Sequence, residues 1–149
     1  MIEIRPARAQ ELNHLIEEST LLLQSLYPEE SNHLVDATDL DADGNMLLAA
    51  LEDDRAIGCV GLLRTSPTEG EIKRLFVDPH HRGKGIAKDL MGRLEGDALE
   101  VGITTLRLET GIYQPESMTL YESLGYHIRP PFGDYVDDPL SVFMEKELV

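Results

Sequence analysis

Two glycines separated by one residue follow an apolar run in the middle of the chain, within the stretch 77–87, which reads VDPHHRGKGIA. Gly83 and Gly85 permit positive φ angles, and a helical pattern begins directly after them. Such a turn directs free N–H groups towards one point in front of a helix N-terminus, where the helix dipole also favours negative charge. Three basic side chains add full positive charge, namely Arg82, Lys84 and Lys88. The stretch therefore predicts a phosphate or pyrophosphate site.

The spacing of this turn excludes two common phosphate-binding loops. A Walker loop has four residues between its first glycine and its Gly-Lys pair, and then Ser or Thr, whereas Ile86 follows Gly85 here. A dinucleotide-binding loop, G-x-G-x-x-G, requires a glycine at the position that Lys88 occupies. The pattern that fits is R-x-x-G-x-A, from Arg82 to Ala87, after a strand and V-x-P.

This pattern resembles motif A of the GCN5-related N-acetyltransferases, the GNAT family, which binds the pyrophosphate of acetyl-coenzyme A. The resemblance implies that acetyl-coenzyme A is the cosubstrate. It also implies that seven residues of the turn and helix contact the cosubstrate, namely Arg82, Gly83, Lys84, Gly85, Ile86, Ala87 and Lys88.

The strand that precedes the turn, Glu71–Val77, loses its alternation because Leu75, Phe76 and Val77 are consecutive and apolar. Either both faces of this strand are buried, or a bulge shifts its phase and leaves amides unpaired. The family resemblance implies the bulge, with the backbone at these three residues pairing with the pantetheine arm of the coenzyme.

A second signature lies downstream and reads Gln114-x-x-Ser117-x-x-Leu120-Tyr121-x-x-x-Gly125-Tyr126. It is similar to the GNAT pattern N-x-x-A-x-x-L-Y-x-x-x-G-F, with Gln114 in place of Asn and Ser117 in place of Ala. The resemblance implies that Gln114, Ser117 and Tyr121 contact the coenzyme, and that the hydroxyl of Tyr121 lies near its sulfur.

The resemblance implies direct transfer of the acetyl group from the thioester to an amine. The amine must first lose a proton, because an ammonium group has no lone pair. The thioester oxygen needs a donor as negative charge develops, and the departing thiolate benefits from a proton. We expect Tyr121 to be the acid, Glu71 to be the base through a water molecule, and an amide of Phe76 or Val77 to serve the oxyanion. Glu109 is the second choice as base, and an ordinary surface role for Glu71 stays open.

A long segment joins the last two strands and carries the expected acceptor contacts. The segment 129–140 holds prolines, a glycine, two aromatic residues and several carboxylates. A loop of this length in a compact domain is usually functional. We expect Phe132, Asp134 and Tyr135, together with Glu109, to bind the acceptor. The family resemblance implies that this segment lies near the acceptor cleft and that the loop after the first helix, with Glu29, Glu30 and Asp36, forms the opposite wall.

Carboxylates on both walls favour a small cationic amine as the acceptor. An acidic rim that only aids solubility is the alternative reading of the same residues. Two other functions stay open, a protein amine as acceptor and a non-catalytic module that senses acyl-coenzyme A.

The elements that position these residues follow from periodicity. We expect strands at 2–5, 46–52, 56–65, 71–77, 104–109, 126–129 and 141–148, and helices at 9–26, 85–100 and 115–124, with a short helix near 33–38. This order is that of an α/β fold, a mixed central sheet of about six to seven strands flanked by helices, and it matches the GNAT fold. The whole chain, 1–149, is then a single acetyltransferase domain.

Composition limits the partners and the compartment. The net charge is −15, from 28 acidic and 13 basic residues, which argues against nucleic acid because its binders need a basic face. The chain shows no signal peptide and no apolar run of about 20 residues, so we expect no membrane partner and a cytoplasmic location. The single cysteine, Cys59, fits a reducing compartment and a buried position. A homodimer stays open as an alternative to a monomer.

No metal is expected. The run Asp39–Gly44 imitates the start of a calcium loop, but Ala50 stands where that loop requires a bidentate glutamate. His80 and His81 are adjacent, and no third ligand is suitably spaced. We therefore expect a solvated acidic turn and two solvated histidines.

Overall fold

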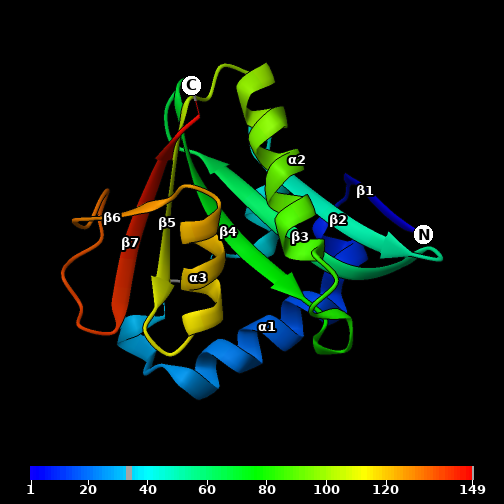
Figure 1. Ribbon diagram of the computed structural model, residues 1–149, viewed down its shortest axis with the longest axis horizontal. Coiled ribbons are helices and arrows are strands. Elements are labelled where there is room, and N and C mark those ends of the chain that lie inside the picture. Colours follow the sequence, from blue (N-terminus) through cyan, green and yellow to red (C-terminus); the bar gives the residue numbers. More distant parts are fainter. Residues whose placement is uncertain (33–34, 149) are drawn as a thin grey trace.

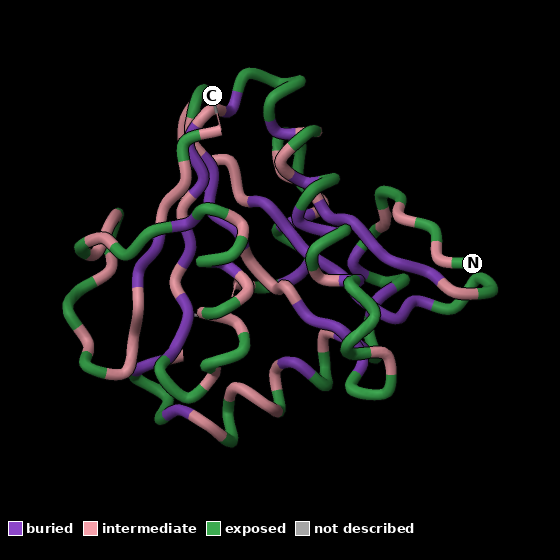
Figure 2. Tube along the Cα trace, viewed as in Figure 1, coloured by how far each residue is buried: buried purple, intermediate pink, exposed green. Residues whose placement is uncertain are grey.

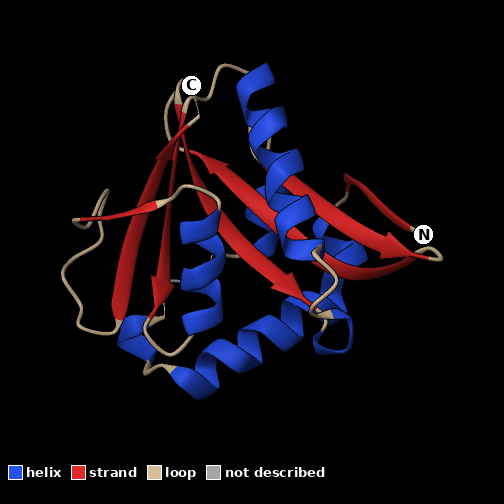
Figure 3. Cartoon of the chain, viewed as in Figure 1, coloured by secondary structure: helices blue, strands red, loops and turns tan. Residues whose placement is uncertain are grey.

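Seven strands form one mixed sheet in the order β1-β2-β3-β4-β5-β7-β6 in the computed structural model, which describes residues 1–32 and 35–148 (Figure 3). The strands are β1 (Ile2–Pro6), β2 (Met46–Glu52), β3 (Arg55–Arg64), β4 (Glu69–Val77), β5 (Thr105–Gly111), β6 (His127–Arg129) and β7 (Ser141–Glu147). Neighbouring strands are antiparallel except β4 and β5. The expected mixed sheet flanked by helices is confirmed.

Helices cover both faces of the sheet and make two separate cores. Helices α2 (Ile86–Glu100) and α3 (Pro115–Ser123) pack on one face, and α1 (Asn13–Leu26) packs on the other with the short 3-10 segments around it. We call the core on the α2 and α3 face the first core and the core on the α1 face the second core. The apolar run of β2 is continuous because its residues alternate between them, with Leu48 in the first core and Leu47 in the second. The buried path along the central strands is visible in Figure 2.

The parallel pair β4–β5 stays together over only a short length. Glu69, Gly70 and Glu71 pair with Thr105, Leu106 and Arg107, and no further pairing follows along the described part of either strand. Helix α2 provides the crossover between the two strands, as parallel pairing requires. Beyond these residues the strands diverge, and α3 and α1 lie around the open end of the resulting V (Figure 1).

A bulge lies in β4 at the point where the strands diverge. Lys73 pairs with Gly61 of β3 and Phe76 pairs with Cys59, so Arg74 and Leu75 both stand opposite Val60. Arg74 has a φ of +59°, in the left-handed region that few residues other than glycine adopt. The bulge implied by the family resemblance is confirmed.

Some boundaries and local environments differ from expectation. The predicted helix at 9–26 begins with a 3-10 turn (Ala9–Leu12) and becomes α-helical only at Asn13. The short helix near 33–38 is a 3-10 helix at Ala37–Asp41, and residues 33 and 34 of that prediction lie outside the described residues. Gly85 is the N-cap of α2 and has a left-handed backbone, so this helix starts one residue later than expected.

The acidic run and the cysteine have structural roles. Asp41 accepts a hydrogen bond from the backbone N–H of Ala9 at 2.9 Å, so it helps to join two 3-10 segments. Among residues 1–32 and 35–148, no three Asp, Glu, His or Cys side chains form a group that could hold a metal ion. Cys59 is 1% exposed, which confirms the expected burial. No helix in the described chain has the length and apolarity needed to cross a bilayer.

Candidate active site

The glycine turn before α2 has the geometry of an anion site. Asp78 caps a 3-10 turn by accepting from His80 N at 2.9 Å, and the chain then passes through Gly83 (φ +82°) and Gly85 (φ +78°). A Cβ at either glycine would meet no atom within 4 Å, so these positions need glycine for their backbone conformation and leave open space in front. The first helical hydrogen bond runs from Asp89 N to Gly85 O, and the amides of 86–88 precede it.

Exposed basic side chains lie at this turn, and the histidine that precedes it is largely buried. Arg82 and Lys84 are exposed, and the guanidinium of Arg82 lies 5.7 Å from the centre of the Phe76 ring. His81 is not the solvated residue that the sequence suggested. Its side chain is largely buried, with Nε2 3.4 Å from the carboxylate of Glu52.

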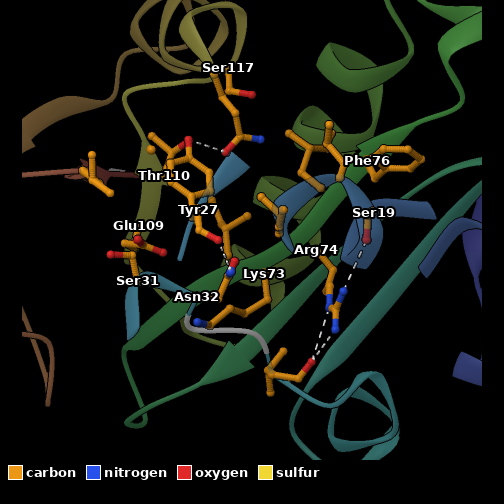
Figure 4. A pocket seen from close by; sticks show the side chains of 18 of the residues that line it. Ser19, Tyr27, Ser31, Asn32, Lys73, Arg74, Phe76, Glu109, Thr110 and Ser117 are labelled. Carbon is orange, nitrogen blue, oxygen red and sulfur yellow. Dashed lines mark hydrogen bonds between the residues drawn. The ribbon is translucent and has the colours of Figure 1, made fainter. Parts of the chain in front are cut away.

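A pocket of about 120 Å³ occupies the open end of the V between β4 and β5 (Figure 4). Six predicted site residues line it, from β4, β5 and α3: Leu75, Phe76, Glu109, Gln114, Ser117 and Tyr121. Further lining residues come from α1 and the segment after it, and they include Leu22, Tyr27, Ser31 and Asn32. Predicted residues that do not line the pocket are Glu71, Val77, Phe132, Asp134 and Tyr135, together with the seven residues of the glycine turn and helix start, 82–88.

Tyr121 is held by burial and by an aromatic neighbour. The side chain lies in the first core, and its ring meets that of Tyr126 edge to face at a centroid distance of 5.8 Å. Its hydroxyl makes no hydrogen bond with any residue in the described ranges 1–32 and 35–148. Burial raises the pKa of Tyr121 above its ordinary value, so the hydroxyl stays protonated over the physiological range.

Tyr27 connects α1 to the start of α3, and sequence reasoning did not identify it. Its hydroxyl donates to Oε1 of Gln114 at 3.2 Å and accepts from the backbone N–H of Tyr113 at 3.2 Å. Gly111 is required beside it, because a Cβ there would collide with the Tyr27 ring. Burial raises the pKa of Tyr27, and this hydroxyl therefore remains a donor to Gln114.

Glu71 is buried beside the pocket and is paired within the protein. Its Oε2 atom accepts from the hydroxyl of Tyr135 at 2.5 Å and lies 2.9 Å from Nζ of Lys73. Lys73 also donates to the Tyr135 hydroxyl at 2.6 Å. Burial, followed by the hydrogen bond to the Glu71 carboxylate, raises the pKa of Tyr135. We call these three residues the Glu71–Lys73–Tyr135 triad.

Glu109 faces the pocket from β5 and accepts from the hydroxyl of Ser141 at 2.8 Å. The segment after α1 contacts the 130–140 loop, because Ser31 donates to Asp138 at 2.6 Å. The exposed carboxylates of the 130–140 loop, Asp134 and Asp137, do not line the pocket. Phe132 packs instead on Tyr135 and on Phe143 of β7, with ring centroids 5.1 and 5.8 Å away.

Two cations line the pocket wall, and neither was predicted as a site residue. Lys73 and Arg74 are neighbours in β4, and both line the pocket with side chains that extend in different directions (Figure 4). The guanidinium of Arg74 donates to the backbone oxygen of Val35 at 2.9 Å and to the hydroxyl of Thr20 at 2.7 Å. The sequence pattern did not mark Lys73 and Arg74 as pocket residues, because the direction of their side chains depends on where the bulge lies.

Comparison with known proteins agrees with this geometry. The sequence profile of the acetyltransferase (GNAT) family matches residues 10–126. A protein named IAA acetyltransferase from Azospirillum brasilense is 44% identical over 90% of this chain and 88% of its own length. The uncharacterised N-acetyltransferase YsnE from Bacillus subtilis is 33% identical over 99% of both chains.

Solved structures show the same fold. A Klebsiella pneumoniae protein provisionally assigned as an acyl-CoA N-acyltransferase superposes with a TM-score of 0.88 at 34% identity, covering 100% of this chain and 99% of its own. The PaiA N-acetyltransferase of Thermoplasma acidophilum, solved with coenzyme A, has a TM-score of 0.77 at 23% identity over 99% of both chains. With the two GNAT signatures, the V-shaped gap and these relatives, the chain belongs to the GNAT family and is an acetyl-CoA-dependent N-acetyltransferase.

Proposed function

We propose that this protein transfers the acetyl group of acetyl-coenzyme A directly to the primary amine of a small molecule held in the pocket between β4 and β5. The observation that carries this proposal is the convergence of three features on one pocket. The bulge of β4, the hydroxyl of Tyr121 and the carboxylate of Glu109 all border it. The glycine turn lies at the end of the same strand, where it can hold the pyrophosphate of the donor.

The donor lies along β4 and α2 in this proposal. Seven residues, from Arg82 to Lys88, bind the pyrophosphate through backbone N–H groups and side-chain charge. The backbone at Leu75, Phe76 and Val77 pairs with the pantetheine arm, and Gln114 and Ser117 contact it from the α3 side. The acetyl group then reaches the pocket, because Phe76 and Tyr121 line it together.

The transfer forms a C–N bond and breaks the C–S bond. The neutral amine attacks the thioester carbon, and an amide of the β4 bulge donates to the oxygen as it becomes negative. Tyr121 then gives its proton to the departing sulfur. The phenol is protonated at neutral pH and so has a proton to give, while burial raises its pKa and makes it a weaker acid than an exposed tyrosine.

We favour Glu109 over Glu71 as the group that receives the proton of the amine. Glu71 does not line the pocket, and its carboxylate is engaged by Lys73 and Tyr135. Glu109 does line the pocket and can act through a water molecule. Glu71 then acts on the reaction by orienting Lys73 and the loop that carries Tyr135.

The acceptor is a small amine, and the pocket favours one cationic group over several. Glu109 supplies a negative charge, which attracts an ammonium group before it loses its proton. Arg74 lies on the same wall, where its charge opposes a second ammonium group, whereas the charge of Lys73 is paired with Glu71. We therefore place monoamines ahead of polyamines among cationic acceptors.

The test is acetyl transfer to a panel of acceptors, followed by thiol release and by mass spectrometry of the acetylated product. The panel contains aliphatic monoamines, spermidine, amino acids, peptides with a free N-terminus, and IAA, the compound in the name of the Azospirillum relative. Gly85→Glu is the control, since it puts a carboxylate in front of α2 and should abolish transfer in a folded protein. Tight binding of acetyl-coenzyme A without any acetylated product would favour the sensor instead.

A further inference from the structure

Arg74 separates the acceptor pocket from a second hollow in the surface. This wider hollow, of about 590 Å³, is bordered by the first 3-10 turn, the start of α1 and the segment 35–41. Arg74 and Val35 line both the pocket and the hollow. These two residues therefore form the wall between the place where the thioester would react and a wide region open to solvent.

The side chain of Arg74 ties this wall together. Its Nε and Nη2 atoms both donate to the backbone oxygen of Val35, at 3.3 and 2.9 Å. Its Nη1 atom donates to the hydroxyls of Ser19 and Thr20 on α1, at 3.3 and 2.7 Å. The bond to Ser19 is drawn in Figure 4. The planar fork of a guanidinium suits such a set of partners, and a lysine ammonium does not reproduce it.

The backbone of Arg74 is strained at the same point. A φ of +59° lies in the left-handed region, which is unfavourable for any residue other than glycine. The strand would be more stable here with glycine if the bulge alone mattered. The arginine side chain offsets that cost by joining the bulge to the middle of α1, whose Leu22 also lines the pocket, as does Tyr27 directly after the helix.

We propose that Arg74 is a positioning residue that holds α1 against the bulge of β4 and keeps water from the outer hollow out of the acceptor pocket. This inference rests on the proposed acetyl transfer. It has two consequences. The bulge amides and the acceptor wall keep a fixed separation, and the thioester meets the amine in place of water.

The competing reaction is hydrolysis of the donor. The oxygen of a water molecule bonds to the thioester carbon, the C–S bond breaks, and acetate and coenzyme A leave, with one proton on the thiol and one released to solvent. This reaction uses the same bulge amides and the same Tyr121 proton as amine transfer. Water entry through the wall should therefore raise thiol release in the absence of an amine.

The experiment compares amine-independent thiol release with acetylation of an amine from the panel, in Arg74→Ala, Arg74→Gly and Arg74→Lys. We expect the first two to raise the ratio of hydrolysis to transfer by about tenfold, and to lower the rate constant for transfer by about 10- to 100-fold. Binding of acetyl-coenzyme A, measured by calorimetry, should change by less than about threefold. The ratio of hydrolysis to transfer in Arg74→Lys should lie between the ratio of these two variants and that of the unmodified protein. Lysine keeps the positive charge but lacks the planar fork of the guanidinium.

Arg64→Ala is the matched control. Arg64 also donates to backbone oxygens across elements, those of Pro67 and Val101 at 2.6 and 2.8 Å, but it does not line the pocket. Its loss should leave the ratio of hydrolysis to transfer unchanged. Arg74→Gly removes the backbone strain as well, so a defect shared by the Ala and Gly variants assigns the effect to the side chain.

An unchanged ratio and rate in Arg74→Ala would overturn this inference, and so would an equal change in Arg64→Ala. Hydrogen exchange gives a second measurement that needs no acceptor, since amides of 19–27 should exchange faster in Arg74→Ala and not in Arg64→Ala. Faster exchange without any change in the ratio would also overturn the water-exclusion role. If the unmodified protein acetylates no amine, the proposed function fails instead, and the exchange result still tests whether Arg74 holds α1.

Discussion

The hydroxyl of Tyr135 donates a 2.5 Å hydrogen bond to the carboxylate of Glu71, joining the loop between β6 and β7 to the buried part of β4. The two residues are 64 positions apart in the chain. Lys73 donates to the same hydroxyl, so the phenol lies between a cation and an anion. This contact fixes the loop over the edge of the acceptor pocket, and its removal is therefore informative.

Tyr135→Phe should lower the free energy of unfolding by about 1–3 kcal/mol, because it removes one hydrogen-bond partner from each of two charged groups, Glu71 and Lys73, which then keep each other as partners. Urea denaturation measures this change. The Michaelis constant for the acceptor should rise while affinity for acetyl-coenzyme A stays the same. Tyr113→Phe is the control for stability, since its ring is 51% exposed. Equal stability of the two variants would show that the triad contributes nothing to the fold.

Tyr121→Phe keeps the ring and removes only the hydroxyl. The dissociation constant of acetyl-coenzyme A should barely change, and the rate constant for transfer should fall by about 10- to 1000-fold if proton donation matters. Burial raises the pKa of Tyr121, so activity of the unmodified protein should not decline from ionisation of this group as the pH rises to 10. Steady-state kinetics between pH 6 and 10 checks both points, and full activity of the variant would limit Tyr121 to packing.

Gly85→Ala should weaken the binding of acetyl-coenzyme A and destabilise the fold by about 1 kcal/mol, since residue 85 has a φ of +78°. Gly92→Ala is the matched control. Gly92 lies inside the same helix, and a Cβ there would meet no atom within 4 Å. This control should be more stable by about 0.5–1 kcal/mol with unchanged affinity. Calorimetry measures the affinity for acetyl-coenzyme A, and thermal melts measure stability. Equal affinity and equal stability of the two variants would contradict this prediction.

Glu145→Gln should change how stability depends on pH. Hydrogen bonds from Arg107, at 2.6 Å, and from Arg129 lower the pKa of Glu145 in the folded protein. A lowered folded pKa gives stability that is present above the ordinary value of about 4.3 and is lost as the pH falls through the folded value. The variant should therefore be less stable than the unmodified protein at pH 7, and this difference should shrink below about pH 4.

Denaturant titrations from pH 3 to 7 measure this difference, with Glu122→Gln as the control at an exposed position. A difference that stayed constant over the whole range would show that the carboxylate does not lose its role on protonation. The network with Arg107 and Arg129 would then contribute through packing alone.

The parts of the site that could be predicted are those encoded by neighbouring residues. Gly83 and Gly85 lie close together and precede a helix, so their turn could be predicted from the sequence. The helix that begins at Pro115 could be predicted in the same way. The order of strands followed from alternation and from turn residues. The bulge of β4 left a visible break at Leu75, although its position at Arg74 did not follow from the pattern.

The contacts that were missed join residues far apart in the chain. Tyr27 and Gln114 are separated by 87 positions, and no local pattern marks a tyrosine as the partner of a distant amide. Glu71 was expected at the start of its strand as an accessible base, yet Lys73 and Tyr135 engage it. Such pairings arise only when the sheet and the loops have assembled.

The short pairing between β4 and β5 also affects how the molecule comes apart. Three residue pairs and the α2 crossover connect a four-stranded antiparallel ribbon, β1–β4, to a three-stranded one, β5–β7. Each ribbon has more internal strand pairing than the seam between them, so what holds the seam is chiefly the shared core on the α2 and α3 face and side-chain contacts such as that between Tyr135 and Glu71. A donor molecule bound in the V, as we propose, would bridge both ribbons and stabilise the assembled state by mass action. Occupancy of the site is thereby coupled to the integrity of the whole sheet.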